Sequence, residues 1–346
     1  MKDFKDKIVF ITGGASGAGL GQAQVFKAAG AKVVIADMNR QRLNEAIRNG
    51  DADYAIKLDV TDRKAFAQAA DEIEKVFGET VDVLILTAGV NTFGPAEAST
   101  YDDYDWVVGV CFGGVVNGLV TFVPRIIKKG KGGYIASTVS WGAFGAGPST
   151  APYSAAKAGV LNLLESYYNA LKPYNIGVSA VCPANINSHI YEAALNRPEN
   201  LQDTGYNVSD KTQNFLASIH KNGLDPKVLA NWLKKGMEDE IFLVIPYDQA
   251  PRMVEIEMER FRYLAYPGGE ADLAALRATP ERQAESGRMG AIREGYDVSN
   301  TGPIVPPADG EKSDAPPPVF AFPDTGGFGM AKADLDYVDP SKKYKQ

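Results

Sequence analysis

The stretch Thr12-Gly13-Gly14-Ala15-Ser16-Gly17-Ala18-Gly19-Leu20-Gly21 decides how this chain folds, because it joins an apolar run to a helical pattern. The run before it, Ile8–Thr12, is typical of a buried strand, and the helical pattern begins at about Ala18. Glycines in such a turn let backbone N–H groups approach a ligand closely, and the dipole of the following helix favours negative charge. The context therefore predicts a strand–turn–helix unit that binds a pyrophosphate.

Short apolar runs alternate with helical patterns through the first 190 residues, as in a parallel sheet covered by helices on both faces. Helices are expected from about residues 18, 40, 62, 101 and 152, and over 225–238, several of them opened by Asn, Asp, Thr or Pro. We therefore expect an α/β fold with a doubly wound parallel sheet. The predicted strands are Ile8–Thr12, Lys32–Asp37, Asp53–Leu58, Val81–Thr87, Gly133–Ser137, Ile176–Cys182 and Ile241–Ile245.

The alternation of strand and helix patterns is lost at two points along the chain. Residues 183–222 are polar and irregular, so we expect a flexible substrate lid at about 189–240 within a domain that covers 1–265. The remaining segment, 266–346, is rich in proline and glycine and reads as an extended arm. Apolar residues within this segment favour its docking on the rest of the same subunit or on another subunit. The alternative is that the segment is disordered.

Composition excludes several classes of protein. The chain is 45% hydrophobic and 23% charged, as in a soluble globular domain, and its net charge of -7 disfavours nucleic acid as a partner. Two cysteines outside any Cys-x-x-Cys pair and two histidines leave too little material for a disulfide framework, a metal site or a Ser-His-Asp triad. No signal peptide is evident, and the uncharged stretch Val107–Val123 is short for a membrane span, so we expect a cytoplasmic protein with a buried helix there.

Four further residues carry chemistry. Asp37 ends the second predicted strand, where its carboxylate can accept hydrogen bonds from a ribose diol and repel a 2′-phosphate; an exposed strand-end aspartate is the plainer alternative. Tyr153 and Lys157 share one helix face, so a nearby ammonium can lower the pKa of the phenol and make it a general acid or base, although Tyr-x-x-x-Lys also arises by chance. Ser140, just past a strand end, can bond a substrate oxygen.

Together these segments resemble the single-domain short-chain dehydrogenases/reductases in order and spacing over about residues 5–265. The resemblance implies a Rossmann-type sheet of about seven strands and hydride transfer between NAD and an alcohol or ketone. It implies that Tyr153 is the acid/base, that Lys157 lowers its pKa and holds the nicotinamide ribose, and that Ser140 orients the substrate oxygen. The segments that carry the resemblance are Thr12–Gly19, Asp59-Val60, Ala88-Gly89, Ser140 with Tyr153-Ser-Ala-Ala-Lys157, and Cys182-Pro183-Ala184 with Asn187-Ser188.

The same resemblance implies a set of cofactor contacts along these motifs. In addition to Tyr153 and Lys157, they are Gly13, Ser16, Gly17, Ala18, Gly19, Asp37, Asp59, Val60, Ala88, Gly89, Pro183, Ile186 and Ser188.

The chain departs from the family pattern most at Cys111, which stands where the fourth catalytic residue, an asparagine, is usual. That asparagine is associated with a water that relays protons to the lysine, partly through a backbone carbonyl that Cys111 retains. An altered relay or a catalytically silent member is therefore conceivable. A reactive thiol is disfavoured, because apolar surroundings raise the pKa of a cysteine.

The sequence leads to one principal hypothesis and two alternatives. The principal one is an NAD-dependent dehydrogenase/reductase for a secondary alcohol or its ketone, with a bulky apolar or aromatic substrate lying against Asn91, Trp141, Phe144 and Tyr191, in a homodimer or homotetramer. One alternative is a dinucleotide sensor or interaction protein with little catalysis. A nucleotide-sugar epimerase or dehydratase fits less well, because Ser16 occupies the second glycine position of that branch.

Overall fold

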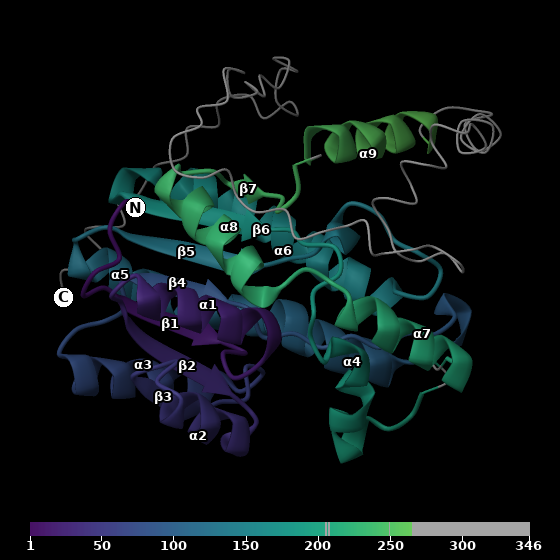
Figure 1. Ribbon diagram of the computed structural model, residues 1–346, viewed down its shortest axis with the longest axis horizontal. Helices are drawn as coiled ribbons and strands as arrows, with labels where there is room; N and C mark the ends of the chain where they lie inside the picture. Colours follow the sequence, from purple (N-terminus) through teal and green to yellow (C-terminus); the bar gives the residue numbers. More distant parts are fainter. Residues whose placement is uncertain (205, 207, 249, 265–346) are drawn as a thin grey trace, which may run out of the picture. The chain divides into compact units, whose positions relative to one another are not determined.

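The computed structural model describes residues 1–264 other than 205, 207 and 249. Its centre is one seven-stranded parallel sheet with the strand order β3-β2-β1-β4-β5-β6-β7 (Figure 1). The order reverses between β1 and β4, and ligands bind at such a switch point in open α/β sheets. The strands are β1 Ile8–Thr12, β2 Lys32–Asp37, β3 Tyr54–Lys57, β4 Val83–Leu86, β5 Gly133–Thr138, β6 Ile176–Val181 and β7 Leu243–Val244.

The doubly wound sheet expected from the sequence is therefore confirmed. All five residues of β1 are buried, because successive side chains point to opposite faces and both faces are covered. Phe10 packs in the cluster on one face, and Val9 and Ile11 pack in the cluster on the other. The predicted arm, residues 266–346, lies outside the described residues.

Helices cover the two faces in two groups. The side chains of α1 Gly17–Ala28, α2 Arg40–Arg48 and α8 Pro226–Glu238 join Val9 and Ile11, and α1 and α8 lie side by side (Figure 1). Those of α3 Arg63–Phe77, α5 Gly114–Lys129 and α6 Ala151–Ala170 join Phe10 on the other face. Side chains of Asn39, Asp62 and Asp225 accept backbone hydrogen bonds at the starts of α2, α3 and α8, as expected of such caps.

The helix expected near Val107 is interrupted by a π-helical turn. α4 Tyr101–Val108 continues through the turn η2 Gly109–Gly113 into α5, and Cys111 lies within the turn. Two of the glycines allow close packing: a Cβ at Gly114 would lie 2.7 Å from Val60, and one at Gly118 would lie 2.5 Å from Leu86. Because π-turns recur at functional sites, this interruption makes the segment Gly109–Gly113 a candidate part of a functional site.

The combined helix Tyr101–Lys129 is long and apolar enough to cross a membrane by length and composition, and it is the single such helix among residues that the structure describes. Half of its most apolar window is buried inside the protein. The core helix of a globular protein can be equally long and apolar. Here the apolar side chains of the helix pack against β4 and α3.

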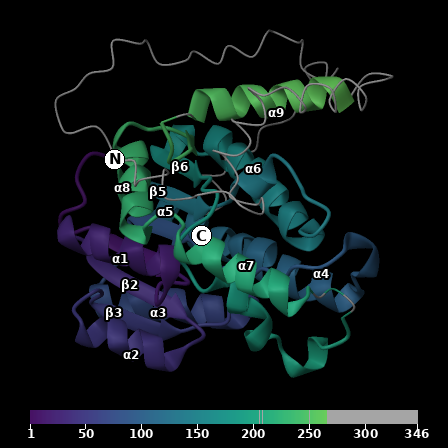
Figure 2. The ribbon, with the colours of Figure 1, turned by 45° about the vertical axis from the view of Figure 1, so that its right-hand side comes forward.

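The segment after β6 is more ordered than its polar sequence predicts. It forms the 3₁₀ turns η5 Ile190–Asn196 and η6 Glu199–Leu201 and then α7 Asp210–Lys221, beyond the carboxyl ends of the strands (Figure 2). The expected lid at 189–240 also included α8, but α8 buries Leu229, Leu233 and Met237 in the core and is therefore part of the domain body. Sequence reasoning also missed α9 Ala250–Leu264; the remaining short turns are η1 Ala96–Ala98, η3 Trp141–Ala143 and η4 Lys172–Tyr174.

Candidate active site

A cavity of about 1050 Å³ opens at the carboxyl ends of the strands and extends under η5 and α7. Most of the residues predicted from the sequence line it, although they come from segments up to 175 residues apart, as between Gly13 and Ser188. They are Gly13, Ser16, Gly17, Ala18, Gly19, Asp37, Asp59, Val60, Ala88, Gly89, Asn91, Ser140, Trp141, Tyr153, Lys157, Pro183, Ile186 and Ser188. Cys111, Phe144 and Tyr191 do not line it.

The glycine turn after β1 leaves no room for side chains. Gly13 has φ +67° and a Cβ there would lie 2.8 Å from the Cα of Ala88, while a Cβ at Gly19 would lie 2.1 Å from the Gly13 carbonyl oxygen. Gly17 has φ +48°, a conformation that strains any L side chain. Ser16 precedes α1 without capping it through its side chain, so the first-turn N–H groups stay available at the cavity. This cradle fits a pyrophosphate at the helix N-terminus.

Asp37 ends β2 at the rim of the same cavity. Its carboxylate accepts hydrogen bonds from the backbone N–H groups of Ala15, at 3.3 Å, and Asn39, at 3.0 Å, which hold it beside the glycine turn. Among the described residues that line the cavity, Lys157 is the single lysine or arginine. A ribose diol therefore finds an acceptor at Asp37, whereas a phosphate in its place finds a negative charge, and the lining residues next to Asp37 include no lysine or arginine.

Tyr153, Lys157 and Ser140 meet where α6 crosses the end of β5. Ser140 Oγ shares a hydrogen bond with the Tyr153 side chain and accepts one from the N–H of Gly142 at 3.0 Å. The Nζ atom of Lys157 donates to the carbonyl oxygen of Thr138 at 2.7 Å and lies 5.6 Å from the centroid of the Tyr153 ring. One substrate oxygen can thus contact both hydroxyls, with an ammonium group close behind.

Burial dominates the electrostatics of these groups. It raises the pKa of Tyr153, an effect that the bond to Ser140 partly offsets, and it lowers the pKa of Lys157. From the sequence, Lys157 is expected to lower the pKa of Tyr153, but in the protein alone the largest effect on that pKa is the loss of water around the phenol, which raises it. Burial therefore favours the neutral form of both groups in the protein alone.

Cys111 lies behind the cavity wall and is fully buried. Its thiol donates to the carbonyl oxygen of Val90 at 3.1 Å, and the N–H of Val90 donates to its sulfur at 3.4 Å. A carboxamide side chain can make the same pair of contacts, as donor and acceptor. Burial raises the pKa of this thiol, as expected, so the residue is a neutral contact for the strand end at Gly89–Asn91.

A polar network behind the site was missed by sequence reasoning. Gln22, which is 0% exposed, donates to Thr138 Oγ1 at 3.0 Å and accepts from Thr87 Oγ1 at 2.7 Å, and the two threonine hydroxyls lie 2.9 Å apart. The network fixes the strand end whose carbonyl holds Lys157. A glutamine inside an apolar helix gives no periodic signal, so only the contacts reveal it.

The far end of the cavity is apolar. Phe144 packs on Trp141 with ring centroids 5.0 Å apart, and Tyr191 stacks on His220 at 5.9 Å, so both predicted contacts lie one layer behind residues that line the space. His220 Nδ1 donates to the Ile186 carbonyl oxygen at 3.2 Å, and burial lowers the pKa of this histidine. The other apolar lining residues here include Phe93, Ile190, Leu201, Val208, Phe215 and Leu216.

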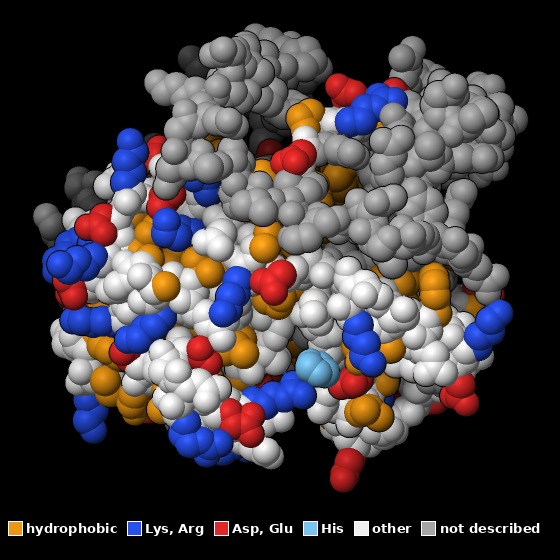
Figure 3. All heavy atoms as spheres, in the orientation of Figure 1, with side chains coloured by type: hydrophobic (Ala, Val, Ile, Leu, Met, Phe, Trp, Pro, Cys, Tyr) orange, Lys and Arg blue, Asp and Glu red, His pale blue; other side chains and the backbone are white. Residues whose placement is uncertain are grey.

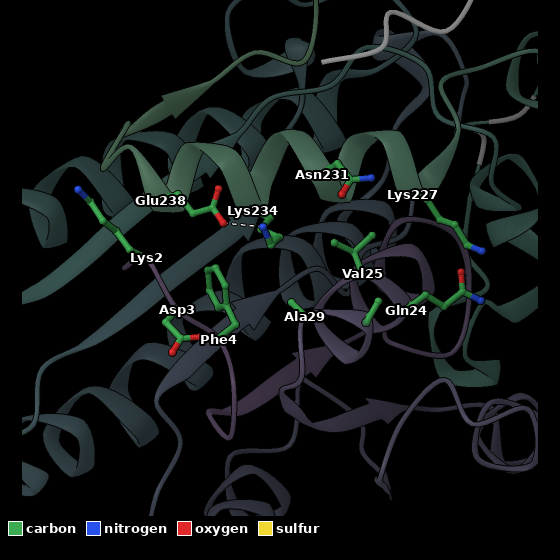
Figure 4. A pocket seen from close by; sticks show the side chains of 11 residues that line it. Lys2, Asp3, Phe4, Gln24, Val25, Ala29, Lys227, Asn231, Lys234 and Glu238 are labelled. Carbon is green, nitrogen blue, oxygen red and sulfur yellow. Dashed lines mark hydrogen bonds and ion pairs between the residues drawn. The ribbon is translucent and has the colours of Figure 1, made fainter. Parts of the chain in front are cut away.

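A second cavity of about 590 Å³ lies between the N-terminal segment, α1 and α8 (Figure 4). Its lining carries charges of both signs, including an ion pair of 2.5 Å between Lys234 and Glu238. Charges of both signs are likewise interspersed over the face seen in Figure 3. None of the residues predicted from the sequence lines this second cavity, and within the described part of the chain no cluster of three or more His, Cys, Asp or Glu could hold a metal ion.

Comparison with known proteins agrees with this geometry. The sequence model of the family described as short chain dehydrogenase matches residues 7–198. A C alpha-dehydrogenase of Sphingobium sp. is 49% identical over 259 residues, which are 74% of this chain and 85% of the relative. Among solved structures, the apo form of LigD from Sphingobium sp. strain SYK-6 is 42% identical with a TM-score of 0.64, over 77% of this chain and 100% of that one. A short chain dehydrogenase/reductase from Burkholderia phymatum in complex with NAD is 26% identical with a TM-score of 0.70, over 77% and 96%.

Proposed function

The chain belongs to the short-chain dehydrogenase/reductase family, and from that premise we propose that it interconverts a bulky, uncharged secondary alcohol and its ketone with NAD as cofactor. The observation that carries the proposal is the meeting of Ser140, Tyr153 and Lys157 in one cavity with the glycine cradle and Asp37. A relative of known structure is described in complex with NAD, which supports this cofactor.

The proposed chemistry assigns one task to each side chain. Ser140 and Tyr153 hold the carbinol oxygen, and Tyr153, after it has lost its own proton and become a phenolate, takes the carbinol proton as the alcohol is oxidised. Lys157 stabilises the phenolate, and Thr138 holds Lys157 in place through its carbonyl oxygen. When bound, oxidised NAD supplies the hydride acceptor and a positive charge that favours the phenolate. In the reverse direction Tyr153 returns the proton to the ketone oxygen.

The lining of the cavity supports the substrate class. Its far end includes many aromatic and aliphatic side chains, and Lys157 is the single lysine or arginine among the lining residues described. A carboxylate or phosphate on the substrate would therefore lack a partner, and burying an unpaired charge is costly. A relative with 49% identity is named a C alpha-dehydrogenase, which supports oxidation of an alcohol carbon.

The test is a Tyr153→Phe variant assayed with NADH and a panel of aryl and aliphatic ketones. We expect turnover to fall at least about 10³-fold while NADH still binds, because the phenol hydroxyl alone is lost. Tyr167→Phe is the matched control, since Tyr167 lies on the same helix but does not line the cavity. Full turnover by Tyr153→Phe would refute the proposal, and NADH binding without turnover by the unmodified protein would favour the dinucleotide sensor.

The same proposal includes the cellular compartment and the oligomeric state of the protein. We expect a cytoplasmic homodimer or homotetramer with a small-molecule substrate, because both cysteines are buried free thiols and the helix α4–α5 exposes apolar side chains. Tyr101 is 88% exposed and Val120 is 64% exposed on that helix. Light scattering measures the mass in solution, and Val120→Asp should lower it if this face is buried between subunits.

A further inference from the structure

Arg197 and Asp103 form a buried ion pair that lies outside the motifs discussed above. The Asp103 side chain is 0% exposed and that of Arg197 is 5% exposed, and the guanidinium Nη2 donates to Asp103 Oδ1. Removing one partner of such a pair leaves an uncompensated buried charge, so the two residues depend strongly on each other. Arg197 follows η5, whereas Asp103 lies in the first turn of α4, 94 residues earlier.

Further hydrogen bonds converge on the same carboxylate. Asp103 Oδ2 accepts from the N–H of Thr100 at 2.9 Å, and its Oδ1 accepts from Thr204 Oγ1 at 2.7 Å. Thr204 Oγ1 in turn accepts from the N–H of Tyr206 at 3.0 Å. Asp102 accepts a backbone hydrogen bond from the same segment, from the N–H of Asp203 at 3.0 Å. Residues 197–204 are therefore joined to the start of α4 at several points.

This attachment shapes a wall of the cavity. The guanidinium of Arg197 donates to the Leu201 carbonyl oxygen at 2.8 Å, and its carbon lies 4.9 Å from the ring centroid of Trp106. Leu201 and Trp106 both line the cavity and pack in one apolar cluster, and so does Ala193. The ion pair thus holds two large side chains of the cavity wall in place: Trp106 from α4 and Leu201 from the segment that begins at Arg197.

We propose that Arg197 and Asp103 are positioning residues that clamp residues 197–204 onto α4 and so fix the Trp106–Leu201 wall of the substrate cavity before substrate binds. The proposal rests on the proposed function, because it assigns that cavity to the substrate. Because the wall is already ordered, binding does not have to bear the entropy cost of ordering it. A wall that is fixed before binding also accepts only substrates that fit its shape. Arg197 and Asp103 make none of the bonds described above to the glycine cradle or to Tyr153, and Tyr153 meets the clamped wall only through the apolar cluster of Trp106 and Leu201, so cofactor affinity and proton transfer should be spared.

The experiment compares Arg197→Gln with Arg125→Gln, a control arginine that pairs with Asp71 and Glu74 between α5 and α3, away from the cavity. Chymotrypsin cleavage after Leu201 and Tyr206 is mapped by mass spectrometry, and NADH affinity, KM and kcat are measured for one large and one small ketone. For Arg197→Gln we expect cleavage at least about tenfold faster, a KM for the large ketone at least about tenfold higher, and NADH affinity and kcat within about threefold. Arg125→Gln should change none of these by more than about twofold.

Two additional variants keep the test decisive where Arg197→Gln folds poorly. Thr204→Val removes one bond to Asp103 at nearly constant volume and should shift cleavage and KM in the same direction by a smaller factor. The double variant Asp103→Asn/Arg197→Gln should recover part of the loss, because two amides can hydrogen-bond without a buried charge.

Two results would overturn the clamp: cleavage no faster than in Arg125→Gln, or NADH affinity and kcat falling by the same factor as KM rises. The cleavage measurement needs no substrate, so it judges the clamp even where no ketone is reduced and the proposed function fails.

Discussion

Replacing Cys111 tests whether a thiol performs the task of a carboxamide at this position. The sulfur is fully buried and bonds both the carbonyl oxygen and the N–H of Val90, next to Gly89 and Asn91 on the cavity wall. Cys111→Val keeps an apolar side chain of similar size but orphans both backbone groups of Val90. Cys111→Ala orphans the same groups and adds a small void, whereas Cys111→Asn restores a donor and an acceptor.

The expected cost follows from those contacts. Each orphaned backbone group costs roughly 1 kcal/mol, at the low end because sulfur is a weak partner. The void left by Cys111→Ala adds about 0.5 kcal/mol. We therefore expect Cys111→Ala to lose about 2.5 kcal/mol and about 5–10 °C in Tm, Cys111→Val slightly less, and Cys111→Asn less than about 1 kcal/mol. Because the wall at Val90 shifts, kcat/KM should fall about 10- to 100-fold in the first two variants.

Urea unfolding followed by tryptophan fluorescence measures the stability, and NADH oxidation measures kcat/KM. Reaction with a thiol reagent provides a separate check, since burial raises the pKa of Cys111 and the unmodified protein should react at this residue only on unfolding. The reasoning would be refuted by a Cys111→Val protein that matches the unmodified one in both stability and kcat/KM. In that case the contacts with Val90 would be incidental.

Three other predictions test the cofactor cradle, the cofactor choice and the clamp. Gly19→Ala should weaken NADH binding more than about tenfold in a fluorescence titration, because its Cβ would lie 2.1 Å from the Gly13 carbonyl oxygen; Gly113→Ala, whose Cβ meets nothing closer than 3.7 Å, is the control. Asp37→Ser should raise the ratio of NADPH to NADH kcat/KM about 10- to 100-fold by removing a like charge from the site of a 2′-phosphate, and an unchanged ratio would argue against this role. For Asp103, desolvation raises the pKa, but its bonds to Thr100, Thr204 and Arg197 lower it overall. Its folded pKa thus lies below the unfolded value of about 3.9, so the stability it contributes is present above that pH and lost as pH falls through the folded pKa. The stability gap between the unmodified protein and Asp103→Asn should then be full at pH 7 and narrow below about pH 4 in urea unfolding; a gap that widens in acid would contradict this.

The fold was predictable because its signals are local. The run Ile8–Thr12, the glycines after it and the alternation of apolar runs with helical patterns each report on a few neighbouring residues, and β1 and α1 form where those patterns predict. The family motifs likewise keep fixed spacing, so residues such as Asp37 and Tyr153 could be named before the cavity that they line was known. Their roles in catalysis stay predictions.

Segments without a local signal were predicted less well. Residues 183–222 are polar, yet α7 forms there because Leu216 and Ile219 are buried at the mouth of the cavity. The π-turn at Gly109–Gly113 also has no sequence signature, and it places Cys111 against Val90. Both depend on partners that are distant along the chain.

The sequence by itself therefore determined the parallel sheet, the glycine turn after β1 and the set of residues available for chemistry, because strand period, helix period and turn geometry are properties of adjacent residues. Only the tertiary structure decided how buried the site residues are, and this burial raises the pKa of Tyr153 and lowers that of Lys157. It also decided the pairing of Arg197 with Asp103, since a desolvated ion pair between residues 94 positions apart exists only once the chain has packed them together.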